Sequence, residues 1–259
     1  MGNVPEIETN NKLTFIGHIG ELRHRLLKCV IVLVITIGIS FFLTEPYIFP
    51  TLISPVKDLL STGEINLIFT QMTEMIGTYM KVSLAAGIIL AMPYLVYQLL
   101  MFVSPALTRR EKKRVYLLLP WITLMFIAGV AFGYFILIPP ATSFLMTFGS
   151  NIADPMIKIG NYISIVTRLL VASGAVFETP VIILFLARLG IVKAKMLSSK
   201  RRHAIVAAFI LAAIITPTFD PINQSLVALP LIVLYEISIW LAKLVQPKEA
   251  LVVTPAPPP

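Results

Sequence analysis

The chain has 259 residues, of which 57% are hydrophobic and only 13% are charged. Soluble globular proteins carry about 25% charged residues, so this composition excludes a water-soluble enzyme and indicates a protein that is solvated by a bilayer. The formal net charge of +8 does not indicate a nucleic-acid partner. The basic residues form short clusters beside apolar runs, as they do in the cytoplasmic loops of membrane proteins.

The first predicted elements are an amphipathic segment over 14–28 and an apolar run over 26–43. Apolar residues in the first segment recur at spacings of 4, 3 and 4, which is typical of one face of a helix at the membrane surface. The apolar run predicts the first membrane-spanning helix. A polar loop is expected over 44–73, in which 52–60 can form a short helix after Ser54-Pro55.

Five further apolar runs predict the remaining spans, at about 79–103, 115–138, 162–189, 204–215 and 226–241. The run at 204–215 would form a helix roughly 18 Å long, shorter than the ~30 Å hydrocarbon core. The sequence therefore predicts an all-α polytopic protein with one six-helix domain over 1–243. A disordered, proline-rich tail is expected over 244–259.

The distribution of lysine and arginine predicts the orientation. Seventeen of these 21 residues lie in the four segments on the side of the termini. Two, Lys57 and Lys158, lie in the three opposite loops. Because cytoplasmic loops carry the excess of basic residues, we expect both termini to be cytoplasmic.

Charged residues also lie well inside the apolar runs. Glu178 lies near the middle of its run, where a carboxylate is costly and indicates a functional site by default. Pro180 disturbs the backbone hydrogen bonding of the same turn, and a polar cavity on this helix would explain both residues. The alternative is a protonated, hydrogen-bonded structural glutamate. For Lys81 and Arg168, nearer the outer ends, we favour a structural role with snorkelling side chains.

Two cytoplasmic carboxylates lie among basic residues and have plain explanations. Glu21 can pair with Arg25 four residues later, and Glu111 can be balanced by neighbouring basic side chains. Glu236 in the last run can cap a polar contact between helices. A Gly-x-x-x-Gly pattern from Gly129 fits a close helix contact, although chance explains it as well.

No motif supports nucleotide, metal or nucleophilic chemistry, because glycine-rich nucleotide loops, His-Glu-x-x-His and Cys-x-x-Cys are missing from the sequence. We therefore expect neither a cofactor nor a metal, and no enzymatic activity. A proton-coupled transporter of small solutes and a structural scaffold are two alternatives that the intramembrane glutamates leave open.

Five motifs, in order, resemble the TatC family of twin-arginine protein translocases. Residues 18–26 resemble the family's N-terminal signature HLxELRxRL, with Ile19 in place of leucine and with Gly20, which loosens the helix. The motifs are HIGELRHRL at 18–26, FVSPALTRREK at 102–112, GAVFETP at 174–180, Thr216-Pro217 with Asp220 and Gln224, and Tyr235-Glu236.

The resemblance implies a glove-shaped six-helix protein of the bacterial inner membrane with no enzymatic activity. It implies a receptor that binds the Arg-Arg signal peptides of folded precursor proteins and recruits single-span partners of the TatA and TatB type. A homo-oligomeric complex, contacts with membrane lipids, and transport driven by the proton-motive force are also implied.

The resemblance also implies roles for individual residues. Glu21 and Glu111 match the acidic signal-peptide contacts, since a carboxylate accepts the planar guanidinium fork that lysine lacks. The remaining implied signal-peptide residues are Arg23, Phe102, Pro105 and Leu107. The apolar core of the peptide is expected to run toward Glu178 and Pro180. Structural or partner contacts are implied for Pro55, Asp220, Gln224 and Glu236.

Overall fold

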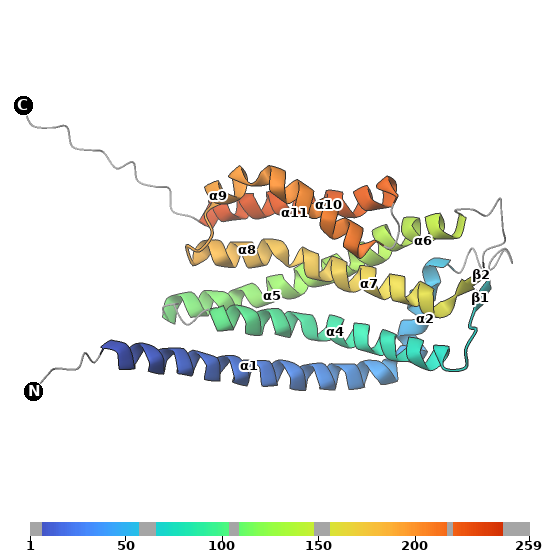
Figure 1. Cartoon of the computed structure of the whole chain (residues 1–259), viewed down its shortest axis with the longest axis horizontal. Helices are drawn as coiled ribbons and strands as arrows, with labels where there is room; N and C mark the ends of the chain where they lie inside the picture. Colours follow the sequence, from blue (N-terminus) through green and yellow to red (C-terminus); the bar gives the residue numbers. More distant parts are fainter. Residues whose placement is uncertain (1–6, 57–65, 104–108, 148–155, 217–219, 246–259) are drawn as a thin grey trace, which may run out of the picture.

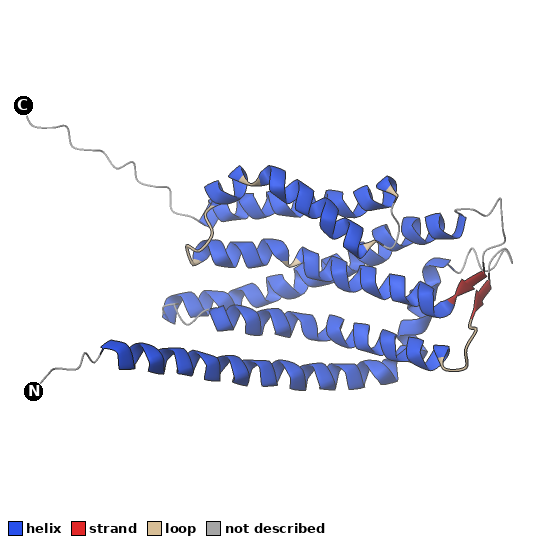
Figure 2. Ribbon diagram, viewed as in Figure 1, coloured by secondary structure: helices blue, strands red, loops and turns tan. Residues whose placement is uncertain are grey.

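The computed structural model describes residues 7–56, 66–103, 109–147, 156–216 and 220–245, without the side chains of 7–18, 66, 103–119 and 146. In this part of the chain, long helices lie side by side in an elongated bundle (Figure 1). Helices make up nearly all of the regular structure (Figure 2). The architecture is therefore the predicted helical membrane fold, with one small exception at one end.

Four of the six predicted apolar runs, at 26–43, 79–103, 204–215 and 226–241, each lie within one helix, whereas the runs at 115–138 and 162–189 each extend over successive helices. The long helices are α1 (Ile7–Leu43), α4 (Glu74–Val103), α5 (Arg109–Phe132), α7 (Ile159–Phe177) with α8 (Thr179–Arg188), and α11 (Pro221–Val245). Shorter helices are α2 (Phe49–Ile53), α6 (Ile138–Thr147), α9 (Ala194–Ser199) and α10 (Arg201–Ile215).

Five stretches in the described part of the chain are long and apolar enough to cross a membrane. They are Ile19–Val56, Glu74–Phe102, Pro120–Leu145, Ile159–Arg188 and Pro221–Val245. The remaining predicted span forms α10, which has 15 residues. At 1.5 Å per residue, α10 is roughly 22 Å long, so it is shorter than the hydrocarbon core.

Two predicted loop boundaries were wrong, and prolines explain both. Helical structure continues through 44–56, where a π-helical turn, η1 (Thr44–Ile48), leads into α2 and a 3-10 turn, η2 (Ser54–Val56). A second π-helical turn, η4 (Gly133–Leu137), leads into α6 across Pro139. A proline frees the carbonyl four residues earlier, and each π-helical turn lies where those carbonyls are freed. The wider turn lets the helix continue where the sequence indicated a stop.

A two-stranded parallel sheet is the exception to the expected all-α fold. Strand β1 (Asn66–Ile68) pairs with β2 (Met156–Lys158), with Leu67 opposite Ile157. Glu74, at the start of α4, accepts hydrogen bonds from the backbone N–H of Thr70 (2.8 Å) and of Gly160 (3.4 Å). These bonds fasten the starts of α4 and α7 together beside the sheet. We call this end of the bundle the sheet end.

Helix α7 is central, because it packs against both α4 and α5, while α1 packs on α4 and α11 packs on α8 and α10. The Gly-x-x-x-Gly pattern of the sequence is a close helix contact. A Cβ atom at Gly129 would lie 2.7 Å from the carbonyl oxygen of Ser173, so only glycine allows α5 to approach α7 this closely. Buried apolar side chains fill the space around α7, including Ile163, Val166 and Leu169.

Helices α4 and α7 both begin at the sheet end and run toward the opposite end of the bundle (Figure 1). That opposite end holds the N-terminal part of α1, the start of α5, the end of α8 and helix α9. Its basic residues include Arg23, Arg25, Lys193, Lys195 and Arg201. We call it the basic end.

Candidate functional site

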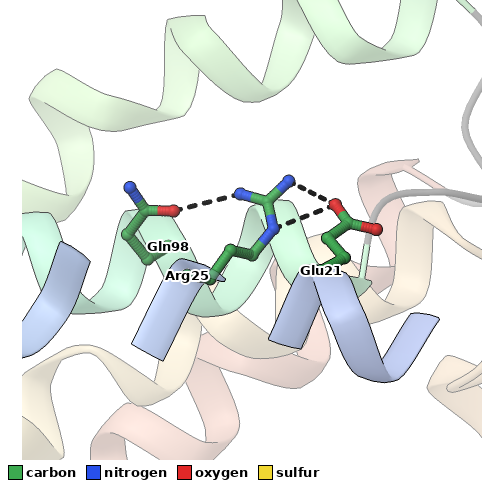
Figure 3. Close-up of polar contacts among 3 residues, drawn as sticks. All are labelled: Glu21, Arg25 and Gln98. Atoms are coloured by element: carbon green, nitrogen blue, oxygen red, sulfur yellow. Dashed lines mark hydrogen bonds and ion pairs between the residues drawn. The ribbon is translucent and has the colours of Figure 1, made fainter. Parts of the chain in front are cut away.

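A chain of polar side chains connects α1 to α4 at the basic end. Arg25 donates from Nε and Nη2 to Oε1 of Glu21, at 3.0 and 2.6 Å, and from Nη1 to Oε1 of Gln98 at 3.0 Å (Figure 3). Gln98 in turn donates from Nε2 to the hydroxyl of Tyr94 at 2.7 Å. We call these four residues the α1–α4 network.

The local sequence explains the network. Glu21 and Arg25 are four residues apart on α1, so their side chains lie on the same face one turn apart. Tyr94 and Gln98 have the same spacing on α4. The predicted pairing of Glu21 with Arg25 is therefore confirmed, and the guanidinium of Arg25 also joins the two helices.

Burial makes this pair stronger than an ordinary surface ion pair. The side chain of Arg25 is 20% exposed and that of Glu21 is 36% exposed, whereas Gln98 is buried. Exposed ion pairs contribute little because water screens them, while hydrogen bonds to partly buried charges contribute about 1.5–3 kcal/mol. The carboxylate of Glu21 is thus held at the rim of the bundle, half accessible to solvent.

The other residues that the sequence assigned to this end lie on the same elements. Arg23 is exposed on α1, and Phe102 is half-buried in the last turn of α4. Glu111 lies in the first turn of α5, and its side chain is not among those described. Pro105 and Leu107 lie outside the described residues. The N-terminal part of α1, the end of α4 and the start of α5, which carry these residues, lie at the same end of the bundle (Figure 1).

Glu178 occupies a different environment. It lies between α7 and α8, is 1% exposed, and neither of its buried carboxylate oxygens has a hydrogen-bond partner among the described residues. The predicted disturbance at Pro180 is confirmed and is larger than expected, because α7 ends at Phe177 and Pro180 occupies the first turn of a separate helix, α8. A hydrogen-bonded structural glutamate is therefore not what the described residues show.

The backbone of Glu178 is satisfied even though its side chain is not. Its N–H donates to the carbonyl of Ala175 at 3.3 Å, and its carbonyl accepts from Val181 and Ile182 at 3.1 and 3.0 Å. The polar cavity expected beside Glu178 stays a prediction, because the open groove on α7 has mostly apolar walls and Glu178 does not line it. The last α7 residue that lines this groove is Ala175, three residues before Glu178.

Asp220 and Gln224 fasten the hairpin of α10 and α11 at its outer turn. Asp220 caps α11, since its Oδ2 accepts from the backbone N–H of Asn223 at 2.8 Å. Gln224 donates from Nε2 to the carbonyl of Phe209 on α10 at 3.0 Å. Both residues therefore have structural partners within the chain.

Glu236 forms a two-point ion pair with Arg201, with contacts of 2.7 Å to Nε and 2.9 Å to Nη2. This pair joins the start of α10 to α11, which confirms the expected polar contact between helices. Pro55 lies half-buried in η2. The preceding carbonyls of Thr51 and Leu52 accept hydrogen bonds from tyrosine hydroxyls of the bundle at 2.8 and 2.7 Å, which anchors this cap.

The sequence reasoning missed Gln98, Tyr94 and Arg201. Gln98 and Tyr94 are polar residues one helical turn apart inside an apolar run. This spacing could have indicated a polar contact, but the sequence analysis considered only charged residues within the runs. Arg201 lies in a basic loop where many residues could have paired with Glu236. For Gln98 and Arg201 the charged partner lies on another helix, and only the packing of the helices selects it.

The fold and the charge pattern define a polytopic helical membrane protein. The family model described as "Sec-independent protein translocase protein (TatC)" matches residues 17–230. The TatC protein of Carboxydothermus hydrogenoformans is 39% identical over 237 residues, which cover 92% of this chain and 96% of that protein. The TatC protein of Aquifex aeolicus is 40% identical over 234 residues, covering 90% and 95%.

Solved structures agree with these relatives. A crystal structure of a twin-arginine translocase receptor, TatC, matches with a TM-score of 0.77 and 40% identity, covering 88% of this chain and 99% of that one. The chain therefore belongs to the TatC family, the receptor subunits of the twin-arginine protein translocase. It is a multi-pass membrane protein of protein transport rather than an enzyme. This membership decides against the small-solute transporter and the scaffold.

Proposed function

We propose that the basic end binds the Arg-Arg signal peptides of folded precursor proteins from the cytoplasmic side. The observation that carries this proposal is the α1–α4 network. It holds the carboxylate of Glu21 half-exposed and already in contact with a guanidinium, that of Arg25. The chemistry that the signal peptide requires is therefore present in the chain itself.

The Arg25 guanidinium is an internal counterpart of a signal-peptide arginine. An incoming arginine adds to this contact or displaces Arg25, which has a second acceptor in Gln98. Glu111 on α5 is the second carboxylate for the second arginine. Because a guanidinium offers a planar fork of donors and an ammonium does not, this pair of carboxylates favours Arg-Arg over Lys-Lys.

The rest of the peptide follows the same elements. Four further residues surround the two carboxylates at the entrance of the site: Arg23, Phe102, Pro105 and Leu107. The apolar core of the peptide runs along α7 and α8 toward Glu178 and Pro180. When the complex assembles, the carboxylate of Glu178 gains the hydrogen-bond partner that it lacks among the described residues. This partner comes from the peptide, from water or from a partner helix.

The proposed topology has six spans in one glove-like domain over 1–243, with both termini cytoplasmic in the bacterial inner membrane. The excess of lysine and arginine on the side of the termini, 17 against 2, supports this orientation. Helix α10, although short, spans where the bilayer thins. The tail that the sequence predicts over 244–259 starts later than expected, because α11 continues to Val245, and the rest of it lies outside the described residues.

Further subunits complete the translocase. Single-span partners of the TatA and TatB type and additional copies of this chain assemble with it, and the proton-motive force drives transport. Four residues keep the surfaces that partners contact in their folded conformation: Asp220, Gln224, Pro55 and Glu236. The hydrogen bonds of Asp220 and Gln224 support this role, because they fix the outer turn of the α10–α11 hairpin.

Site-specific photo-crosslinking in native membranes tests the receptor site. A photoreactive residue in an Arg-Arg signal peptide is expected to label the chain near Glu21 and Glu111, and a Lys-Lys peptide of otherwise identical sequence is the control. Labelling that disappears with Lys-Lys supports the proposal. Equal labelling by both peptides would reduce the interaction to general hydrophobic affinity and overturn the assignment of the two carboxylates.

A further inference from the structure

An open groove with a volume of about 430 Å³ lies between α4 and α7, in the halves of these helices nearer the sheet end. Its walls are mostly apolar and include Leu84, Ile88 and Val171. Two cationic side chains, Lys81 and Arg168, also line it. Both helices belong to stretches long and apolar enough to cross a membrane, so the groove lies within the membrane-spanning part of the bundle.

The two cations line the same groove and lack acidic partners among the described residues. The ammonium of Lys81 donates to the hydroxyl of Ser164 at 3.1 Å, and Arg168 follows Ser164 by one helical turn on the same face. The hydroxyl of Ser164 itself donates to the carbonyl of Gly160. Arg168 is exposed. The groove thus presents cationic donors to whatever occupies it.

The order of residues along the groove matches the order of groups in a lipid. Lys81 is seven residues from the start of α4, and Arg168 is nine residues from the start of α7. At 1.5 Å per residue, both cations lie roughly 10–14 Å from the sheet end of their helices. The apolar residues of the groove continue from there toward the middle of the bundle. A charged group toward the membrane surface and an apolar chain toward its centre fit this arrangement.

We propose that this groove binds an anionic phospholipid of the leaflet at the sheet end. Its headgroup phosphate accepts hydrogen bonds from Lys81 and Arg168, and one acyl chain lies along Leu84, Ile88 and Val171. Basic pockets between membrane helices recognise anionic headgroups in this way. The lipid gives both cations a counter-charge, which snorkelling to the interface alone does not.

Native mass spectrometry of the purified full chain tests the proposal, with phosphatidylglycerol and phosphatidylcholine of identical acyl chains as probes. We expect preferential retention of phosphatidylglycerol. Lys81→Gln and Arg168→Gln should each weaken the retention of phosphatidylglycerol about fivefold, because one cation near the membrane surface strengthens the binding of an anionic lipid about fivefold. The double variant loses both contributions and should weaken retention about 30-fold. Lys158→Gln, which removes a cation at β2 outside the groove, is the matched control and should retain the lipid.

A second variant keeps both cations and fills the apolar part of the groove. Ala172→Trp should reduce the binding of phosphatidylglycerol while the thermal midpoint, Tm, stays near that of the parent chain. Equal retention of the two lipids, or full retention by the double variant, would overturn the proposal. A photoreactive residue at Leu84 distinguishes the occupants in native membranes. A lipid adduct supports the proposal, and an adduct with a single-span protein would assign the groove to a partner helix instead.

Discussion

Two carboxylates in this chain have opposite environments, although the sequence marks both as sites of function. Glu21 at the basic end accepts two hydrogen bonds from Arg25 and is 36% exposed. Glu178 in the bundle is 1% exposed, and its carboxylate oxygens have no partner among the described residues. The desolvation of the first is compensated within the chain, whereas that of the second is not.

This difference predicts how each residue couples stability to function. Changes at Glu21 remove an interaction that exists before any ligand binds, so binding and stability should fall together. A change at Glu178 that removes its carboxyl group should raise the free energy of unfolding and reduce function. Unpartnered buried polar groups in native structures are rare, and a functional demand is the common reason for their retention.

The largest effect is expected for the double variant Glu21→Gln with Glu111→Gln. Each carboxylate contributes a charge-assisted contact to one arginine of the signal peptide, and such contacts contribute about 1.5–3 kcal/mol. The Kd for an Arg-Arg peptide should therefore rise about 100-fold or more. Titration of the purified protein with a fluorescent peptide measures this, and Glu45→Gln at the sheet end is the control. An unchanged Kd would show that the carboxylates do not bind the arginines.

The next effect concerns Glu178→Leu, which replaces a buried carboxyl with an apolar side chain of similar size. Because neither oxygen has a partner to lose, the free energy of unfolding should rise by about 1–3 kcal/mol, while export of a precursor protein is lost. Glu178→Gln keeps a buried polar group and should leave Tm nearly unchanged. A lower Tm for the leucine variant would mean that the carboxyl has a partner in the folded protein, and full export would remove its functional role.

The sequence predicted those features that depend on neighbouring residues. The Glu21–Arg25 pair follows from a spacing of four on one helix, and the break between α7 and α8 follows from Pro180. Gln98 was missed because it contacts Arg25 across 73 positions of the chain, and no local pattern encodes that contact. Strands β1 and β2 have three residues each, too few for a recognisable alternation.

The prolines show a subtler limit of the sequence. Pro139 and Pro140 directly follow the predicted span at 115–138, and Pro180 lies inside the predicted span at 162–189. Only Pro180 interrupts its helix, because a π-helical turn before Pro139 accommodates the freed carbonyls. Whether a proline stops a helix depends on the packing that stabilises the wider turn, and this packing is tertiary.

A third, smaller effect is expected at Gln98, which supports the basic end without contacting the peptide. In Gln98→Leu the guanidinium of Arg25 loses its acceptor on α4, so α1 is held less firmly against the bundle. The free energy of unfolding should fall by about 1–2 kcal/mol. The Kd for the Arg-Arg peptide should rise only severalfold. Gln98→Glu restores an acceptor for Arg25 and should recover most of the loss in both measurements. Equal defects in the two variants would argue that Gln98 acts through packing alone.

The smallest effect is expected for the ion pair of Glu236 with Arg201, which is a reference for both carboxylates. Arg201 contacts both carboxylate oxygens of Glu236, whereas Arg25 contacts only Oε1 of Glu21. The side chains of Glu236 and Arg201 are nevertheless 46% and 50% exposed. Water screens such a pair, so Glu236→Gln should lower the free energy of unfolding by no more than about 1 kcal/mol. The Tm should fall further in high-salt buffer for the parent chain than for this variant. A loss as large as that of Gln98→Leu would mean that exposure is not what separates these sites, and that contact geometry sets the contribution of each carboxylate.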